Sequence, residues 1–353
     1  MFADCKGEGK NRHGEERHEK RGTKARRHVG TEARRHEGNT GGLRRSGTGR
    51  WGKKSGIAYD VVEWRNMFSR LILIFTTLLA GPAMAQITTT RPFPGVTYSE
   101  EIRTNPPLRL FWAQADLSNS SVHLRVCPGG AAQAPPWETT LLPVSKIAER
   151  EHLDIAVNGS AFAPKDVMNI LGRRIPYFEG NLARSCGWTM TDGRLWSASP
   201  LGNLGAPTLI AHADGSMTIS TLTTVPTDAK QMVSGFAPLL KEGRNQAPDD
   251  SPAPRCAVGL DREARTLTLM VIDGRQLDYS AGVSLEGLAH EMALLDCWTA
   301  VAMDGGGSAT MVRRDGQKWN VVNRPSDGHD FPIRFSIERA VASAIGISVD
   351  GAR

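Results

Sequence analysis

The chain has 353 residues, with 43 Lys and Arg against 37 Asp and Glu and a formal net charge of +6. This basic excess does not identify a nucleic-acid-binding protein, because residues 1–66 alone hold 17 basic and 9 acidic side chains. Residues 86–353 keep 25 basic and 28 acidic residues, so we expect no nucleic-acid partner for this part of the chain.

The first 66 residues are low in complexity, with repeated Arg-Arg-His fragments and few apolar side chains. We expect a disordered basic leader, or an upstream extension that comes from a misassigned start codon. A basic arm that binds nucleic acid is the alternative.

Residues 67–85 have the pattern of a secretory signal peptide. Met67 opens a short basic region, the apolar run Leu71–Ala80 follows, and Ala83-Met84-Ala85 precedes a predicted cleavage site before Gln86. The apolar run is too short to span a bilayer. We therefore expect an exported protein, periplasmic or secreted, that keeps no stable membrane anchor after cleavage.

The part of the chain after residue 85 contains four cysteines: Cys127, Cys186, Cys256 and Cys297. None of them forms a C-x-x-C pair, so a zinc site or thioredoxin-like chemistry is not expected. An even number of cysteines in an exported chain favours one or two disulfide bonds, with buried free thiols as the alternative. We expect no metal ion and no cofactor.

Alternating apolar residues predict the first elements of the chain. The Thr- and Pro-rich stretch 86–107 is expected to be an extended N-terminal segment, and strands are expected at 108–115 and 121–127. Pro143 opens a predicted helix that ends at His152, and a strand over 153–157 follows.

That last strand leads into the sequence Asn-Gly-Ser-Ala-Phe, which supplies the first candidate site residues: Asn158, Gly159 and Phe162. An Asn side chain offers both a donor and an acceptor, which suits a sugar hydroxyl or acetamido group. An ordinary Asn-Gly turn is the alternative.

The middle of the chain reads as short strands and tight turns. The stretch Gln231–Arg244 contains Gly235, and we expect this stretch to return toward the cleft that holds the candidates Asn158, Gly159 and Phe162. Strands at 256–260 and 266–272 form a predicted hairpin, with Arg255 just before the first of them. Ser284 is a predicted N-cap for a helix that reaches Cys297.

The strongest site signal is the stretch Thr299–Met311, in which five mostly apolar residues predict a buried strand. Asp304, Gly305, Gly306, Gly307 and Ser308 follow that strand directly. Glycines lack a Cβ, so their N–H groups can turn toward one point and form an anion-binding concavity with the carboxylate at its rim. A Gly-rich hairpin loop with a turn aspartate is the alternative.

The end of the chain predicts a hairpin of Thr310–Arg313 with Trp319–Val322 and a closing strand over Ala340–Val349. Residues 86–353 contain no clean linker or internal repeat, so we predict one domain. We expect the α+β or mixed α/β class: a strand-rich domain with a large mixed sheet and a few flanking helices.

Several separated stretches, taken in order, resemble the phosphodiester glycosidase family. The stretches that carry the resemblance are Pro94–Tyr98, Asp154–Phe162, Ser234-Gly235, Pro254–Gly259, Val271–Gly274, Met303–Met311, Asn323–Gly328 and Glu338-Arg339. They extend over roughly residues 94–349. The chain departs from the family pattern at Ala161, at Cys256 and in a longer segment over His329–Ile337.

The resemblance implies an exported hydrolase that cleaves the bond between a sugar's anomeric carbon and a phosphodiester, releasing free sugar and a phosphate monoester. Such a leaving group has a second pKa of about 6, so it needs charge stabilisation more than a general acid. We assign Asp304 the role of general base or nucleophile at the anomeric carbon.

The remaining candidates divide between the two halves of the implied substrate. The glycine amides with Ser308, Arg255 and Arg324 are assigned to the phosphate, because guanidinium groups match phosphate oxygens. Asn158 and Asn323 are assigned to the sugar. A surface ion pair is the alternative role for Arg255, and a turn position is the alternative for Arg324.

Two other functions are compatible with the same residues. One is a non-catalytic exported protein that binds a glycan or phosphosugar, and the other is a metal-independent phosphodiesterase that cleaves a P–O bond. A substrate in capsule, exopolysaccharide or wall-polymer metabolism is compatible with export.

Overall fold

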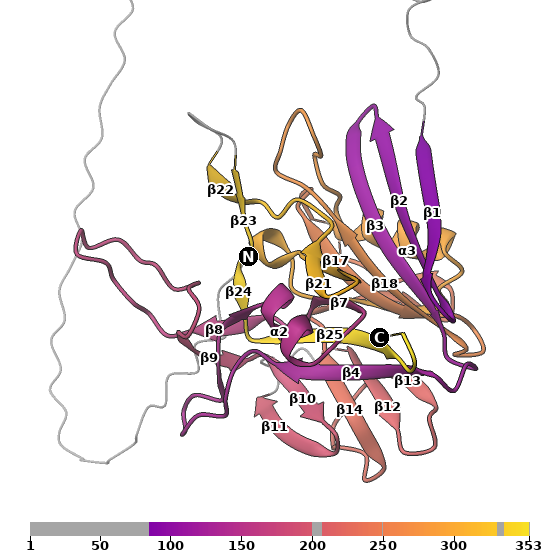
Figure 1. The fold of residues 1–353 in the computed structure, drawn as a ribbon, viewed down its shortest axis with the longest axis horizontal. Coiled ribbons are helices and arrows are strands. Elements are labelled where there is room, and N and C mark those ends of the chain that lie inside the picture. Colours follow the sequence, from indigo (N-terminus) through magenta and orange to yellow (C-terminus); the bar gives the residue numbers. More distant parts are fainter. Residues whose placement is uncertain (1–84, 200–206, 249, 330–334, 353) are drawn as a thin grey trace, which may run out of the picture. The chain divides into compact units, whose positions relative to one another are not determined.

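The computed structural model describes residues 85–199, 207–248, 250–329 and 335–352. The predicted leader and the predicted signal peptide up to residue 84 lie outside these residues. Within them the fold is rich in strands and contains two α-helices (Figure 1). All pairings between the described strands are antiparallel.

The predicted fold class, α+β or mixed α/β with a large mixed sheet, is therefore wrong, although the strand-rich character is confirmed. The helices are short, because α2 covers only Val144–Arg150 and α3 only Leu285–Leu294. A parallel crossover needs a connection of a dozen or more residues, usually a helix. Many successive strands of this chain are instead joined by tight turns, which favour antiparallel hairpins.

The largest sheet has eight strands in the order β1-β2-β3-β18-β17-β19-β15-β16. These strands are β1 (Gln86–Phe93), β2 (Val96–Thr104), β3 (Pro107–Asp116), β15 (Ala237–Lys241), β16 (Arg244–Asn245), β17 (Arg255–Leu260), β18 (Thr266–Ile272) and β19 (Thr299–Ala302). The stretch 86–107, expected to be merely extended, thus forms the hairpin of β1 and β2. Gly95 has a φ of 72° in its turn, a conformation that favours glycine.

A second sheet has five strands in the order β21-β20-β7-β25-β4. Its strands are β4 (Val122–Pro128), β7 (Ile155–Asn158), β20 (Met311–Asp315), β21 (Lys318–Val321) and β25 (Ser343–Val349). The predicted hairpin at 310–322 and the predicted closing strand are both confirmed by β20, β21 and β25.

A third sheet, also of five strands, has the order β11-β10-β14-β12-β13. Its strands are β10 (Gly187–Thr191), β11 (Arg194–Ser199), β12 (Pro207–His212), β13 (Met217–Thr221) and β14 (Ala229–Ser234). Small sheets complete the described part: β5 (Thr139–Thr140) with β9 (Leu182–Ser185) and β8 (Phe162–Pro164), β6 (Leu142–Pro143) with β24 (Ala340–Val341), and β22 (Asp327–His329) with β23 (Phe335–Ile337).

The hydrophobic core lies in layers set by the alternation of side chains along the strands. On β18, Leu269 and Val271 belong to a cluster shared with Val157 and Ile345 of the second sheet. Met270, the residue between the first two, points to the opposite face and joins a cluster with α3. Each fully buried Leu, Val or Ile contributes roughly 1.5–3 kcal/mol relative to an exposed position.

The two helices cover the outer faces of these two sheets. Helix α3 packs on the eight-stranded sheet, and its predicted N-cap is confirmed because the Ser284 hydroxyl accepts the Gly287 N–H at 3.0 Å. Helix α2 packs on β7, β20 and β25 of the second sheet. The order of layers is therefore helix, eight-stranded sheet, second sheet, helix.

The expected disulfide bonds are absent from the described residues. Cys127, Cys186, Cys256 and Cys297 are all buried and none of them is disulfide-bonded. Cys256, Cys297 and Cys127 lie in three different core clusters, so they are packed as small apolar residues. Burial raises the pKa of Cys297 to about 11 and of Cys127 to about 12, which keeps these thiols protonated.

Candidate active site

Two aspartates follow the ends of neighbouring inner strands of the eight-stranded sheet, and the register of β17 brings them to the same end of the sheet. This strand pairs antiparallel with β18 on one side, where Arg255 is opposite Ile272, and with β19 on the other, where Ala257 is opposite Ala302. Asp273 directly follows β18, and Asp304 follows β19 after Met303. The sheet topology therefore places both aspartates at the end of the sheet where β17 begins with Arg255.

Asp304 is a buried carboxylate with an exposed fraction of 8%. It accepts hydrogen bonds from the Ser308 hydroxyl and from the Gly305 backbone N–H. Burial raises the pKa of Asp304 to about 6, although both donors and the charge of Arg339 act in the opposite direction. The carboxylate is therefore mostly ionised at neutral pH yet readily protonated, a property that suits acid–base chemistry.

Asn158, the last residue of β7, holds the backbone around Asp304. Its side-chain amide donates to the Asp304 carbonyl at 2.6 Å and accepts the Thr310 N–H at 3.1 Å. The next residue, Gly159, accepts the Asp304 N–H at 3.1 Å through its carbonyl. Asn158 thus joins the second sheet to both ends of the glycine-rich segment, and its role toward a sugar stays a prediction.

Gly306, Gly307 and Ser308 form a short 3-10 turn, η1 (Gly306–Ser308), that Gly305 precedes. The segment Asp304–Ser308 is called the glycine turn below. The Gly306 N–H donates to the Pro254 carbonyl at 2.9 Å, and the Gly305 N–H is directed at the Asp304 carboxylate. These two amides therefore have partners within the protein, and the predicted anion-binding role of the segment stays a prediction.

Close packing explains why this turn is built from glycines. A Cβ on Gly307 would overlap with the Asp327 carboxylate and the Arg339 guanidinium, and Gly306 has a φ of 61°. A Cβ on Gly306 would also lie 3.0 Å from Nη1 of Arg275. The absence of side chains lets two arginines approach the turn on which Asp304 sits.

A chain of polar and aromatic contacts leads away from Asp304. Arg339 lies 3.5 Å from the Ser308 hydroxyl through Nη1 and pairs with Asp327 through Nε at 2.7 Å. Its guanidinium also lies 4.0 Å from the ring centroid of Tyr177, which contacts Phe162 edge to face at 6.0 Å. Phe162 is therefore connected to the site through Tyr177 and Arg339.

Asp273 is the centre of a second network, and its exposed fraction is only 1%. It accepts the Asn323 amide N–H at 2.8 Å, the Arg324 backbone N–H at 2.8 Å and a hydrogen bond from Tyr279. Burial raises the pKa of Asp273 to about 7 against the effect of these donors. Asn323 also donates to the Ala309 carbonyl at 3.0 Å, so this network reaches the end of the glycine turn.

Basic side chains gather near the Asp273 network. The guanidinium carbons of Arg109 and Arg324 lie 4.9 Å and 5.2 Å from the ring centroid of Tyr279. Arg275 is exposed, has a φ of 60° and makes no side-chain hydrogen bond or ion pair with a described residue. Its guanidinium lies against Gly306, so it offers an unused cation beside the glycine turn.

The remaining sequence candidates serve packing and local structure. Arg255 donates to the Val283 carbonyl at 3.0 Å and to the Ser251 carbonyl at 2.8 Å, and it pairs with Asp250. Gly235 lies so close to β19 that a Cβ would overlap with the Val301 side chain. Neither residue is directed at the Asp304 carboxylate by these contacts.

Residues 151–348 match the phosphodiester glycosidase family. The chain belongs to this family. The predicted resemblance is thereby confirmed over the region that holds the glycine turn and both aspartates. The search of curated proteins found no significant match.

Solved structures with the same fold include relatives from animals and bacteria. The catalytic domain of zebrafish N-acetylglucosamine-1-phosphodiester alpha-N-acetylglucosaminidase, auto-inhibited by its pro-peptide, is 19% identical, with a TM-score of 0.51 over 76% of this chain and 85% of that one. A Burkholderia pseudomallei K96243 protein described as exported is 14% identical, with a TM-score of 0.54 over 76% and 97%. A hypothetical protein from Synechocystis is 13% identical, with a TM-score of 0.53 over 76% and 64%.

Several residues of this candidate site were not among our sequence candidates. They are Asp273, Arg275, Tyr279, Asp327 and Arg339. The sequence did contain one signal, because Asp273-Gly274 repeats the pattern of Asp304-Gly305: an apolar strand that ends in Asp and Gly. Val271–Gly274 carried part of the family resemblance, but we did not make Asp273 a candidate site residue.

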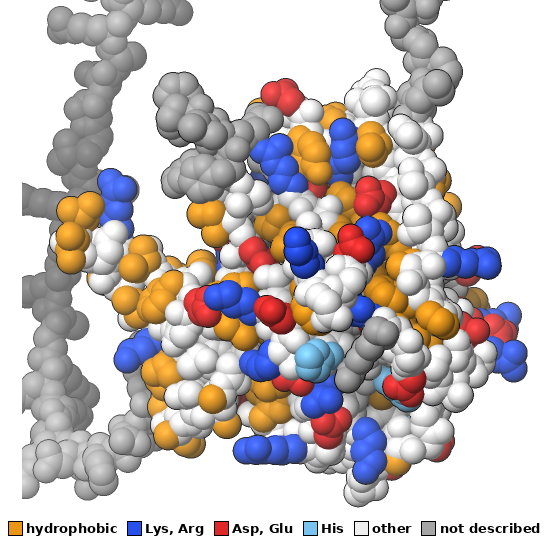
Figure 2. Space-filling view, viewed as in Figure 1, with side chains coloured by type: hydrophobic (Ala, Val, Ile, Leu, Met, Phe, Trp, Pro, Cys, Tyr) orange, Lys and Arg blue, Asp and Glu red, His pale blue; other side chains and the backbone are white. Residues whose placement is uncertain are grey.

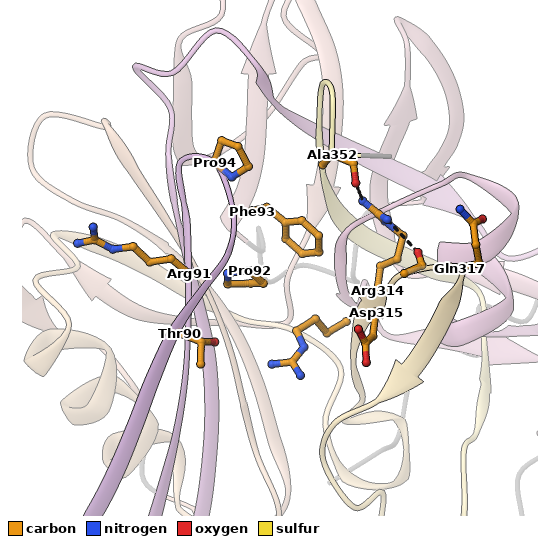
Figure 3. Close-up of a pocket in the computed structure, with 11 residues that line it drawn as sticks. Thr90, Arg91, Pro92, Phe93, Pro94, Arg314, Asp315, Gln317 and Ala352 are labelled. Atoms are coloured by element: carbon orange, nitrogen blue, oxygen red, sulfur yellow. Dashed lines mark hydrogen bonds between the residues drawn. The ribbon is translucent and has the colours of Figure 1, made fainter.

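A cavity of about 560 Å³ lies elsewhere on the protein (Figure 3). Its lining includes Arg313 and Arg314 of β20, and Arg314 bonds Asp154 before the start of β7, whereas Asn158 lies at the end of β7. Figure 3 shows Arg314 reaching the Ala352 carbonyl. The cavity therefore lies toward the end of the second sheet away from Asp304.

Two further findings concern the described residues only. No group of three or more His, Cys, Asp or Glu side chains in this part of the chain is arranged to hold a metal ion. The helices that the structure describes are all too short or too polar to cross a membrane.

Proposed function

We propose that the protein hydrolyses the bond between the anomeric carbon of a sugar and a phosphodiester, with Asp304 as general base or nucleophile. The observation that carries this proposal is the setting of Asp304. The carboxylate is buried, has a pKa raised to about 6, is fixed by Asn158 and Ser308, and lies on a turn that the free cation of Arg275 approaches.

One carboxylate is sufficient for this reaction because of the leaving group. An ordinary glycoside needs a general acid to protonate the departing oxygen. A phosphate monoester leaves as an anion and needs little protonation, so the second group at the site has to be a cation. Arg275 and Arg324 have side chains that make no ion pair with a described residue, and we assign them to the phosphate.

Asp304 needs to be ionised in order to attack the anomeric carbon or to activate a water molecule. Above a pH of about 6 it is ionised, and the Ser308 hydroxyl and Gly305 N–H hold it in one orientation. The positive charge of Arg339 also favours the ionised form of Asp304, although the Arg339 guanidinium itself pairs with Asp327. Asn158 and Asn323 act as positioning residues, and the aromatic pair of Phe162 and Tyr177 forms the side of the site available to the sugar.

The test is release of reducing sugar by residues 86–353, which contain every described strand and helix. A panel of UDP-sugars and other sugar-1-phosphodiesters should include N-acetylglucosamine, the sugar in the name of the zebrafish relative. We expect release by the unmodified protein and none by Asp304→Asn. Binding of a donor without turnover by both proteins instead indicates a phosphosugar-binding protein.

Water labelled with ¹⁸O separates the glycosidase from a phosphodiesterase. Attack at the anomeric carbon puts the label into the sugar, whereas attack at phosphorus puts it into the phosphate. We expect the label in the sugar. Label in the phosphate contradicts the proposed bond cleavage.

We also propose that the protein is exported. The support is the signal-peptide pattern of residues 67–85, together with a structural relative that is described as exported. A reporter protein fused after residue 85 of the native chain tests this, since active reporter outside the cytoplasm requires that the segment works as a signal.

A further inference from the structure

The segment between β8 and β9, residues 165–181, is called the projecting hairpin below. Figure 1 shows it extending away from the sheets, and the space-filling view shows hydrophobic side chains gathered on it beside a basic one (Figure 2). Sequence reasoning gave this segment no role. Its surface carries a higher concentration of exposed hydrophobic side chains than the rest of the described chain.

The projecting hairpin is held in shape by its own hydrogen bonds. The Ile175 N–H donates to the Val167 carbonyl at 2.9 Å, and the Asn169 N–H donates to the Arg173 carbonyl at 2.9 Å. The Asn169 side chain accepts two backbone N–H groups at the tip, both at 2.9 Å. The apolar side chains are therefore presented to solvent by an ordered turn.

The tip of this hairpin is unusually apolar for a solvent-exposed surface. Ile170 is fully exposed, Leu171 is 72% exposed and Met168 is 63% exposed. Six of the eleven large hydrophobic side chains that are exposed in the described residues lie between positions 168 and 178. Scattered exposed apolar residues need no explanation, but a concentrated group marks an interaction site.

Basic side chains flank these apolar residues. Residues 165–181 contain three basic side chains and two acidic ones: Asp166, which pairs with Arg174 at 2.5 Å, and Glu179, which pairs with Lys146 of α2 at 2.6 Å. Lys165 and Arg173 are exposed and make no side-chain hydrogen bond or ion pair with a described residue. The hairpin therefore carries a surplus of positive charge directly beside its apolar tip.

We propose that the tip of the projecting hairpin inserts into the headgroup region of an anionic lipid membrane. Exposed Leu and Ile side chains with Lys and Arg beside them have the composition of an interfacial membrane contact. The apolar side chains with the greatest exposure, Ile170 and Leu171, are adjacent on a narrow turn, whereas a stable protein partner typically buries a broad contact of about 800 Å² on each surface. The shape and charge of the tip therefore fit a lipid surface better than a protein.

The base of the same hairpin belongs to the candidate active site. Tyr177 lies under the Arg339 guanidinium, and Asn181 ties the two arms together by donating to the carbonyls of Lys165 and Pro176. Insertion of the tip brings the site close to phosphodiesters attached to lipids. This consequence for the substrate rests on the proposed glycosidase function, whereas membrane contact itself does not.

The experiment places an environment-sensitive fluorophore at the tip of the full-length chain. Leu171→Cys is labelled in a Cys5→Ser background, where the other cysteines are buried. The matched control carries the label at Leu294→Cys, an exposed leucine of α3. Each protein is titrated with vesicles of phosphatidylcholine alone or with 30 mol% phosphatidylglycerol.

We expect a blue shift and increased emission from position 171 with the anionic vesicles only, and no change from position 294. Adding Arg173→Ser should raise the lipid concentration at half-saturation about fivefold, the factor that corresponds to about 1 kcal/mol per basic residue. The control at position 294 also reports any tethering of the chain by the basic residues 1–66.

Three results of the vesicle titrations overturn the proposal. They are an unchanged signal from position 171, an equal change at both labelled positions, and an equal response to neutral and anionic vesicles. A signal from position 171 that grows with protein concentration in the absence of lipid assigns the tip to a second copy and also overturns it. Because the fluorescence needs no turnover, these outcomes are independent of the glycosidase assays.

Discussion

Asp273 and Asp304 end neighbouring parts of the same sheet, and both are followed by glycine, yet their surroundings differ. Asp273 accepts three donors from the chain, and its exposed fraction is 1%. Asp304 accepts two donors, both from its own turn, and its exposed fraction is 8%. Asp273 joins separate loops to one another, whereas Asp304 is fixed within one turn.

The comparison shows that a raised pKa alone does not identify the reacting group. Burial raises the pKa of Asp273 further, to about 7, than that of Asp304, to about 6. The oxygens of Asp273 are nevertheless occupied by Asn323, Arg324 and Tyr279, which leaves little access for a substrate. We therefore interpret Asp273 as a positioning residue and Asp304 as the group that meets the substrate.

The largest expected effect is that of Asp304→Asn on turnover. We expect kcat to fall by about 10³-fold, since a positioned base or nucleophile contributes roughly 10²–10⁴-fold. Steady-state kinetics on the best substrate of the panel provide the measurement, with circular dichroism to show that the variant is folded. A folded variant that keeps more than a tenth of the activity contradicts the assignment of Asp304.

The second effect concerns stability as a function of pH. Each carboxylate has a native pKa above its unfolded value of about 3.9, so the native state holds more protons over this interval. Stability is therefore lost as pH rises, from about 4 to 6 for Asp304 and from about 4 to 7 for Asp273. One pKa unit corresponds to about 1.4 kcal/mol, which gives losses on the order of 2–3 and 4 kcal/mol.

Replacing either Asp by Asn removes the corresponding part of this pH dependence. Relative to the unmodified protein, each variant should gain unfolding free energy between pH 4 and pH 7, and the gain should be greater for Asp273→Asn. Urea unfolding at both pH values measures it, and the comparison between pH values cancels hydrogen bonds lost at every pH. Parallel stability curves for all three proteins contradict the burial of these charges.

The third prediction compares two arginines near the glycine turn. Arg275→Ala should lower kcat/KM by about 10–100-fold, because a charge-assisted hydrogen bond is worth roughly 1.5–3 kcal/mol. Arg255→Ala should mainly lower stability, by about 1–3 kcal/mol, since Arg255 already bonds Ser251, Val283 and Asp250. The reverse pattern, measured by kinetics and urea unfolding, returns the phosphate role to Arg255.

Local pattern was sufficient to predict the elements around the site. The strand at 266–272, the N-cap Ser284 and the strand that leads to Asp304 follow from apolar alternation and a polar cap. The fold class did not follow, because local pattern does not say which strands pair. Three predicted helical or extended segments became shorter helices or a hairpin once tertiary pairing had formed.

The roles of the site residues were harder to predict for the same reason. Asn158 and Asn323 were candidates from the sequence, but the partners that they have in the fold, Thr310 and Asp273, are set by pairing between distant strands. Arg255 and Arg275 look equivalent in the sequence. Only the fold shows that the Arg255 guanidinium is hydrogen-bonded to a loop at Ser251, whereas the Arg275 guanidinium lies beside Gly306 without a bond to a described residue.

The smallest effect, that of Asp273→Asn on activity, is the sharpest test of the comparison between the two aspartates. The Asn323 amide and the Arg324 N–H both donate to Asp273, and an Asn at position 273 offers only one accepting oxygen. We expect one of the two loops to shift and kcat/KM to fall by about tenfold. The midpoint of its rise with pH should stay near 6, because Asp304 still titrates.

A change that only destabilises the protein leaves the kinetics of the folded protein unaltered. Removal of the reacting group, in contrast, abolishes the rise of kcat/KM with pH and therefore its midpoint. Asp273→Asn is therefore expected to differ from both, with lowered kcat/KM at an unchanged midpoint. If the midpoint disappears and activity falls as far as in Asp304→Asn, the two carboxylates react as a pair. The site then uses the two-carboxylate chemistry of ordinary glycosidases, and the argument from the phosphate leaving group is wrong.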